Sequence, residues 1–260
     1  MAVAVGVEAK VRTRGRPIPA FGLIGWRWIS RNPAVAITPV LLPFIFLYFL
    51  TLISPPSLLP LEIVGAMLFT TQNMGGWVLG DSAFYRLECA LQDLFVASPL
   101  RKFQYLFGIA FANLIAAVPA LVSLGLLLSW ALGRNGTVLG PAPWLILIGC
   151  IIAVWILFSA VGIAISSQLK SQREIWPVSN LTFTVLGLLS PLYYPLSYLP
   201  PIWQAATLFL PTTYAALLVQ AAFGITPASP SAMALYAGLL LAGAVIGTMV
   251  ALRLYEWRAR

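Results

Sequence analysis

Residues 191–213 read PLYYPLSYLPPIWQAATLFLPTT, and this stretch decides how the rest of the chain is interpreted. It is apolar enough to enter a lipid bilayer, but each of its five prolines lacks the amide hydrogen that a continuous helix needs. The segment must therefore bend. Irregular backbone at membrane depth is tolerated only where protein covers it or where it lines a watery cavity. We predict that the segment lies over a membrane pathway or at its mouth, with an apolar surface loop as the alternative.

The composition indicates a helical membrane protein. Of the 260 residues, 60% are hydrophobic and 8% are charged, whereas soluble domains carry about 25% charged residues. The fifteen Lys and Arg residues outnumber the seven Asp and Glu residues, which in a soluble chain would suggest nucleic-acid binding. In a membrane protein the same excess marks the cytoplasmic side, so we expect no nucleic-acid partner.

Six apolar runs are candidate transmembrane helices, since about 20 apolar residues cross the hydrocarbon layer. They lie at residues 34–53, 61–80, 105–132, 144–166, 178–190 and 232–252. The fifth run has only about thirteen residues, or about 20 Å of helix, so residues 191–224 are predicted to complete it as re-entrant or surface-lying helices. Residues 1–33 are predicted to form a cytoplasmic tail and an interfacial helix, and residues 34–260 a single transmembrane domain.

The distribution of positive charge predicts the orientation. With six spans and both termini in the cytoplasm, fourteen of the fifteen Lys and Arg residues lie on the inner side and only Arg134 lies outside, in agreement with the positive-inside rule. A seventh span over residues 205–223 would move Arg253 and the two arginines after it outside. We therefore predict a multi-pass protein of the plasma membrane with both termini cytoplasmic.

The inner loop at residues 81–100, DSAFYRLECALQDLFVASPL, has the pattern of an amphipathic helix. Asp81 or Ser82 is predicted to cap its start, and Ser98 with Pro99 to end it. Three of the seven acids of the chain lie here, where an anionic leaflet would favour basic residues. The loop is therefore either a docking surface for another protein or an ordinary solvated helix. Its apolar face would carry Phe84, Leu87, Leu91 and Leu94 or Phe95, and its polar face Arg86, Glu88, Gln92 and Asp93.

Two stretches resemble the type-2 ABC export permeases, the ABC-2 family that includes daunorubicin-resistance-like members. The run LQDLFVASPLRKFQYLFG at residues 91–108 resembles their coupling-helix region, in which an acidic amphipathic helix and a Ser-Pro stop precede a basic pair. The run at residues 195–213 is similar to their second signature. Cys89 and Gln92 depart from the family, whose members often have Gly and Glu there. The second signature is matched by Pro195, Leu199, Pro200, Pro211, Thr212 and Thr213.

The resemblance implies an all-α permease with six transmembrane helices, an interfacial helix before the first span and a broken segment after the fifth. It also implies that a separate ABC ATPase binds ATP and magnesium and docks on the coupling helix, and that a second permease copy or a paralogue completes the pathway. The prolines of residues 191–213 would form an outer gate. The docking residues would be Arg86, Glu88, Leu91, Gln92, Asp93, Leu94, Ser98 and Pro99, and the gate residues Pro191, Pro195, Leu199, Pro200 and Pro211.

The sequence lacks the residues that several kinds of catalysis, metal binding, nucleotide binding and ion coupling require. The chain contains no histidine, so it cannot hold a Ser-His-Asp triad or a histidine metal site. It also lacks the glycine-rich loop with Lys that binds nucleotide phosphates. The one acid inside a predicted span, Glu62, lies at the outer end of the second span, and none lies near mid-membrane, where proton- or sodium-driven carriers usually place a carboxylate. We therefore predict a transport subunit that is not an enzyme and has no cofactor of its own.

A cluster of polar residues near the middle of the second span is the candidate substrate pathway. Amides are costly to bury unless they are paired or hydrated, so these side chains are predicted either to line a cavity or to form hydrogen bonds between helices. The aromatic residues Tyr193, Tyr194, Tyr198 and Trp203 favour an interfacial belt over a ligand site. The candidate pathway residues are Thr70, Thr71, Gln72 and Asn73, with Asn113 from the third span and Asn180 and Thr184 from the fifth.

The predicted function is the ATP-driven export of an amphiphilic substrate, either a drug-like molecule or a membrane lipid. A lipid-linked glycan is an alternative cargo. A passive channel or a membrane scaffold that needs no ATPase is the main rival. A membrane-embedded enzyme is disfavoured, because the sequence presents no nucleophile with a neighbouring base.

Overall fold

The computed structural model describes residues 17–89, 91–98, 100–134, 139–255 and 257. Every regular element in these ranges is helical, which confirms the predicted all-α class. The elements are α1 (Pro17–Arg31), α2 (Pro33–Ile53), the 3-10 turn η1 (Pro56–Leu58), α3 (Leu59–Leu87), α4 (Leu91–Ala97), α5 (Lys102–Arg134), α6 (Pro141–Ser166), α7 (Gln172–Leu189), the 3-10 turn η2 (Leu196–Tyr198), α8 (Pro201–Thr207), α9 (Pro211–Ala222) and α10 (Pro230–Leu254).

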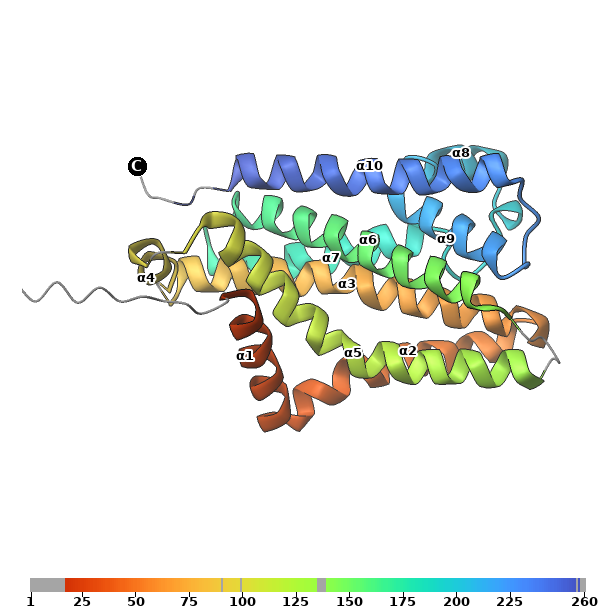
Figure 1. The fold of residues 1–260 in the computed structure, drawn as a ribbon, viewed down its shortest axis with the longest axis horizontal. Helices are drawn as coiled ribbons and strands as arrows, with labels where there is room; N and C mark the ends of the chain where they lie inside the picture. Colours follow the sequence, from red (N-terminus) through yellow and green to blue (C-terminus); the bar gives the residue numbers. More distant parts are fainter. Residues whose placement is uncertain (1–16, 90, 99, 135–138, 256, 258–260) are drawn as a thin grey trace, which may run out of the picture.

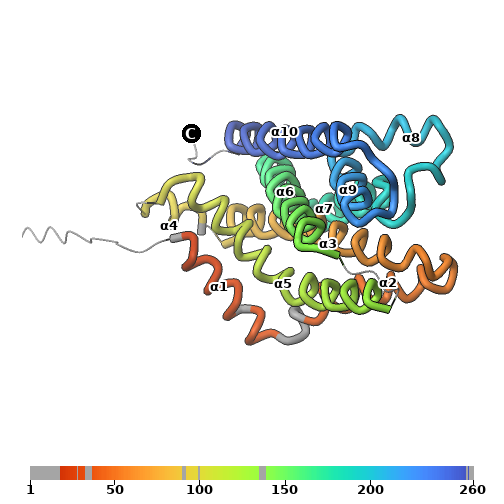
Figure 2. Tube along the Cα trace, turned by 45° about the vertical axis from the view of Figure 1, so that its right-hand side comes forward, coloured from red at the N-terminus to blue at the C-terminus, as the bar shows by residue number. Residues whose placement is uncertain are grey.

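Helix α3 is the centre of the bundle and is buried along most of its length. It packs against α5, α6, α7 and α9. Glycine makes the closest of these contacts possible, because a Cβ atom on Gly162 of α6 would lie 2.2 Å from the Gly75 carbonyl oxygen of α3. Small residues allow membrane helices to approach backbone to backbone. In Figure 2, α2 and α5 run along one flank of α3, while α10 with α8 and α9 forms the other.

The long helices place their ends at two poles of the molecule (Figure 1). One pole, here called the α4 end, holds α4, the last residues of α3, α6 and α10, and the first residues of α5 and α7. Hydrogen bonds connect these ends, since Arg86 at the end of α3 binds the Ser166 carbonyl at the end of α6. Lys102 at the start of α5 binds the Leu252 carbonyl of α10. The opposite pole, the α8 end, holds η1, α8, α9 and the start of α10.

Three of the described helices, α5, α6 and α10, are long and apolar enough to cross a membrane. Helices α8 and α9 form an apolar pair bent by 102°, which would be a fourth crossing if the pair is one broken span. The predicted bend in the proline-rich segment is therefore confirmed. The apolar part of α2, Ile37–Ile53, is shorter than these, so the six-span topology stays a prediction.

The helix that contains the predicted fifth span, residues 178–190, begins before that span. Helix α7 begins at Gln172 and has 18 residues, or about 27 Å. The Ser171 hydroxyl accepts a hydrogen bond from the Arg173 amide at 3.3 Å and caps its start. The first turn of α7 is polar, so hydropathy does not identify the start of the helix. Hydropathy indicates which residues lie in the membrane and not where the backbone hydrogen bonds of a helix begin.

The predicted helix start at Asp81 or Ser82 is wrong. Helix α3 continues without a break to Leu87, and a separate seven-residue helix, α4, starts at Leu91. Asp81 lies within this continuous helix and therefore caps no helix start. Its carboxylate accepts a hydrogen bond from Asn113 at 2.8 Å. The predicted stop at Ser98 is confirmed, since the Ser98 hydroxyl donates to the Phe95 carbonyl at 2.6 Å directly after α4. Pro99 lies outside the described residues.

Candidate functional site

A groove of about 620 Å³ lies between α2, α3 and α7. Its walls are mainly apolar and aromatic, with Phe46 and Phe49 from α2 and Phe69 and Trp77 from α3. Five polar side chains interrupt these walls. Four of the five are residues that the sequence assigned to the pathway. The polar lining residues are Thr38, Thr70, Asn73, Asn180 and Thr184.

Local hydrogen bonds set the orientation of the polar residues on α3. The Thr70 hydroxyl donates to the Ala66 carbonyl at 2.7 Å, and the Asn73 amide nitrogen donates to the Phe69 carbonyl at 3.1 Å. The Asn73 side-chain oxygen is left to accept from a ligand. Asn180 and Thr184 are exposed on α7 and are four residues apart, so they share one face of that helix. The groove can therefore offer hydrogen bonds from two sides to a mostly apolar molecule.

The other three predicted pathway residues lie elsewhere. Thr71 and Gln72 are fully buried, where Thr71 donates to the Met67 carbonyl at 2.8 Å and Gln72 donates to the Phe183 carbonyl of α7 at 3.1 Å. Asn113 lines a different cavity, between α1, α3, α4 and α5, together with Asp81. Successive helical residues turn by about 100° and so reach different neighbours. Gln72 and Asn113 therefore form hydrogen bonds between helices, Asn113 also lines a cavity, and Thr71 bonds within its own helix.

The prolines of residues 191–213 begin helices more often than they interrupt them. Pro201 and Pro211 are the first residues of α8 and α9, positions where a missing amide hydrogen costs nothing. Pro195 and Pro200 stand just before η2 and α8, and Leu199 lies between these elements. Pro191 is buried, and its carbonyl accepts a hydrogen bond from the Gln220 side chain at 3.4 Å.

The bent segment is fixed to the bundle by its threonines and by a close approach to α3. The Thr212 and Ser190 hydroxyls are hydrogen-bonded to each other, and Thr213 donates to the Thr207 carbonyl at 2.6 Å. A Cβ atom on Gly65 of α3 would lie 2.3 Å from the Leu192 carbonyl oxygen. The segment is therefore held directly against the central helix.

Tyr193 connects the bent segment to the groove. Its ring lies 4.8 Å from that of Phe46 and 5.9 Å from that of Phe69, both of which line the groove. Tyr193 is buried, so the expected interfacial belt does not include it. Tyr198 and Trp203 are more than half exposed, as a belt requires. The segment therefore adjoins the groove at its α8 end.

The predicted docking residues at the end of α3 and on α4 fall into two groups, one exposed and one directed into the protein. Glu88, Asp93 and Leu94 are exposed at the α4 end, and Ser98 is half-buried. Arg86 instead points inward and donates to the carbonyls of Ser166 at 2.6 Å and Leu169 at 2.7 Å. Arg86 is therefore unavailable for docking, because the C-terminal end of α6 occupies it. The side chain of Leu91 lies outside the described part of the structure.

Gln92 also faces the protein, with 6% of its surface exposed. Its side-chain oxygen accepts from the Tyr255 hydroxyl at 2.9 Å, and its nitrogen donates to the Trp257 carbonyl at 3.4 Å. Burial raises the pKa of the Tyr255 phenol to about 12, so at physiological pH the hydroxyl keeps the proton that it donates. Lys102 binds the carbonyls of Leu252 and Tyr255. Helix α4 and the start of α5 are thus both attached to the segment that follows α10.

A family model described as ABC-2 type transporter matches residues 22–224. The chain belongs to this family. The match covers both the α4 loop and the bent segment, so it confirms the resemblance on which these two regions were interpreted. The protein is therefore a membrane-embedded permease component of an ABC transporter, a transport subunit and not a catalytic one. A comparison with curated protein sequences finds no match.

Sequence reasoning did not identify several residues of this ABC-2 permease that contact the candidate sites. The sequence marks Phe46 and Phe69 only as apolar residues of the predicted spans and Lys102 only as a member of a basic pair. It predicts no role for Tyr255. The basic pair Arg101-Lys102 at the start of α5 was the one available signal for Lys102. Among the described residues, no group of His, Cys, Asp and Glu side chains could hold a metal ion.

Proposed function

We propose that this ABC-2 permease is the membrane subunit of an ATP-driven exporter, and that the groove between α2, α3 and α7 is its substrate pathway. The observation that carries the proposal is the meeting of Thr70, Asn73, Asn180 and Thr184 in one apolar groove. These residues come from two helices more than one hundred residues apart in sequence. The bent segment adjoining the groove through Tyr193 would be the outer gate.

The distribution of charge supports placing the α4 end in the cytoplasm. Arg86, Lys102 and Arg253 lie at this end, as do three exposed cations, Arg101 and Lys170 of the adjoining loops and Arg173 in the first turn of α7. Arg134 lies at the end of α5 near the opposite pole. Positive charge is concentrated on the cytoplasmic side of membrane proteins. This orientation agrees with six spans, cytoplasmic termini and a place in the plasma membrane.

The groove chemistry favours an amphiphilic cargo. Ligand sites with aromatic walls and a few placed polar groups select molecules with an apolar body and few hydrogen-bonding groups. A drug-like molecule or a membrane lipid has this character. A lipid-linked glycan would need many more polar partners along its path, so we rank it second.

A second permease copy or a paralogue would close the groove. The groove residues Leu42, Ile45, Phe49 and Leu188 are each about half exposed in the single chain. Contiguous exposed apolar surface of this kind marks contacts with protein or lipid. Pairing two such faces would convert two open grooves into one enclosed pathway.

The energy for transport would come from a separate ABC ATPase that binds ATP and magnesium and docks at the α4 end. The exposed Glu88, Asp93 and Leu94 supply a mixed acidic and apolar surface for it. The buried Gln92, next to Asp93 on α4, bonds to Tyr255 and Trp257. A movement of α4 would therefore be passed on to the end of α10.

The groove is tested by the double substitution Asn180→Leu with Thr184→Val, assayed for export of a fluorescent amphiphile. We expect export to fall at least fivefold with little change in the thermal unfolding midpoint, because both side chains are exposed in the groove. Ser129→Val, at an exposed serine of α5 outside the groove, should export normally. Normal export by the double variant would reject the groove as the pathway. Ion conductance without an associated ATPase would favour the passive channel.

A further inference from the structure

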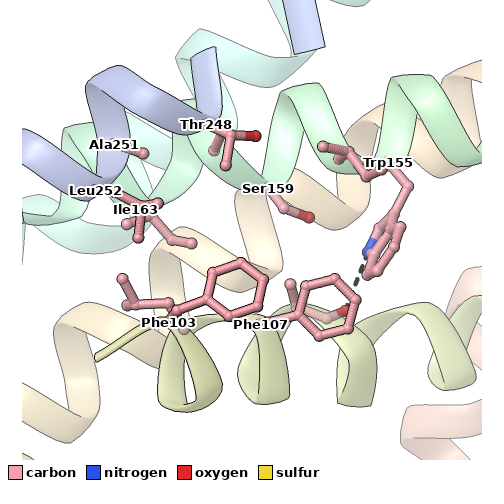
Figure 3. A pocket seen from close by; sticks show the side chains of 12 residues that line it. Phe103, Phe107, Trp155, Ser159, Ile163, Thr248, Ala251 and Leu252 are labelled. Carbon is pink, nitrogen blue, oxygen red and sulfur yellow. Dashed lines mark hydrogen bonds between the residues drawn. The ribbon is translucent and has the colours of Figure 1, made fainter. Parts of the chain in front are cut away.

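A third cavity lies between α5, α6 and α10, towards the α4 end of the molecule, and shares no lining residue with the groove. Its volume is about 250 Å³. Phe103 and Phe107 of α5 form its floor in Figure 3, and Trp155, Ser159 and Ile163 of α6 face them, with Thr248 on α10. A dry apolar cavity of about 150 Å³ already binds benzene, so this one has room for part of a larger apolar ligand.

Ser159 is the polar group that this cavity leaves unsatisfied. It is 3% exposed, and its hydroxyl has no hydrogen-bond partner in the described part of the chain. Figure 3 shows the hydroxyl directed from α6 into the cavity. The other polar groups of the wall are used, since Thr248 donates to the Ala244 carbonyl at 2.7 Å and the Trp155 indole donates to the Ala110 carbonyl at 3.0 Å. A buried unpaired hydroxyl is unfavourable, so a ligand with an acceptor group would satisfy it.

The rim of the cavity at the α4 end is positively charged. Lys102 directly precedes the lining residue Phe103, and its ammonium group binds the carbonyl of the lining residue Leu252 and that of Tyr255. An ammonium group has three donors, so one is left for an anion. Arg253, the residue after Leu252, is exposed. The rim therefore matches a phosphate group, while the cavity matches a hydrocarbon chain.

We propose that this cavity binds one acyl chain of an anionic phospholipid from the leaflet at the α4 end. The Ser159 hydroxyl donates to an ester carbonyl, and the phosphate faces Lys102 and Arg253. Ser159 is seven residues before the end of α6 at Ser166, which is about 10 Å along the helix, so its hydroxyl lies deeper in the molecule than a phosphate at the α4 end. The half-exposed Phe103 marks the side where the chain enters.

The test is native mass spectrometry of the purified full chain, delipidated in detergent and titrated with phosphatidylglycerol or phosphatidylcholine. We expect one phosphatidylglycerol to be retained in preference to phosphatidylcholine. Ser159→Trp fills the cavity and should lower retention at least tenfold. Ser159→Ala removes one hydrogen bond and should lower it about fivefold, and Arg253→Gln should reduce the preference for phosphatidylglycerol.

Ser129→Trp is the matched control, because it adds the same side chain at an exposed serine of α5 outside the cavity, and it should retain lipid as the unaltered chain does. Equal retention by Ser159→Trp and Ser129→Trp, whether high or low, would overturn the site. Equal binding of both lipids would overturn the role of the charged rim. If Ser159→Trp does not fold, Thr248→Trp fills the cavity from its α10 side, and its retention is judged against the same control.

Discussion

At the scale of single residues, two glycines set the distance between the central helices. A Cβ atom on Gly162 would meet the Gly75 carbonyl oxygen, and one on Gly75 would lie 2.4 Å from the Phe183 ring and 2.5 Å from the Phe158 carbonyl oxygen. Backbone atoms cannot move aside as a flexible side chain can. Even one added methyl group must therefore push α3 and α6 apart.

We predict that Gly162→Ala lowers stability by about 1–3 kcal/mol, the usual cost of overpacking a close contact. Gly149→Ala is the matched control on the same helix, since nothing lies within 4 Å of a Cβ atom there. The measurement is the thermal unfolding midpoint of each purified variant in detergent. A midpoint for Gly162→Ala equal to that of Gly149→Ala would show that the two helices do not meet at this glycine pair.

Polar residues show which part of the candidate site the sequence could predict. The run Thr70, Thr71, Gln72 and Asn73 stood out because amides are rare in an apolar span. Only the first and last of the four line the groove. A helix points neighbouring residues in different directions, and choosing among those directions requires knowing where α7 packs. Gln92 was misassigned for the same reason, because the sequence does not reveal that Tyr255 lies beside it.

At the scale of elements, α4 has one side for a partner and one for its own chain. Helix α3 is 29 residues long, or about 43 Å, which exceeds the roughly 30 Å of the hydrocarbon layer. With the α4 end in the cytoplasm, as proposed, we expect its last turns to hold α4 beyond the apolar part of the membrane. The exposed acids face outward there, and Gln92 faces the end of α10.

We predict that reversing the charges of both acids, Glu88→Arg with Asp93→Arg, prevents an ABC ATPase from co-purifying with the permease. Gln92→Leu should retain the ATPase but lower the substrate exported per ATP hydrolysed at least threefold, because it removes the bonds to Tyr255 and Trp257. Glu174→Arg, at an exposed acid near the start of α7, is the control and should do neither. If the double variant keeps its ATPase and full export, docking does not use this face of α4.

Element boundaries were harder to predict from the sequence than the elements themselves. All six apolar runs are helical where the structure describes them, apart from Ser190 at the end of the fifth, and the bend after the fifth was expected from its prolines. The helix start predicted at residues 81–82 is wrong, and the start of α7 lies before the predicted fifth span, because a polar turn can continue a helix as well as end it. Ser171 acts as a cap through its hydroxyl, whereas Asp81 and Ser82, of the same capping residue types, lie within a continuous helix.

At the scale of the whole molecule, the proposed docking, gate and direction of transport all depend on the orientation of the chain in the membrane. The α4 end must face the cytoplasm if an ATPase is to dock there, and the bent segment must then face outward. The two cysteines of the chain allow a direct test, because Cys89 is exposed between α3 and α4 whereas Cys150 is buried. A water-soluble thiol reagent can therefore report on the α4 end of the unaltered protein.

The decisive measurement is the labelling of Cys89 by a membrane-impermeant maleimide, before and after the cells are permeabilised. We predict no labelling in intact cells and full labelling after permeabilisation. A Ser197→Cys variant, with its new thiol at an exposed position of η2, should be labelled in intact cells and shows that the reagent reaches the outer face. Labelling of Cys89 in intact cells would place α4 outside and contradict the proposed docking, gate and direction of transport together.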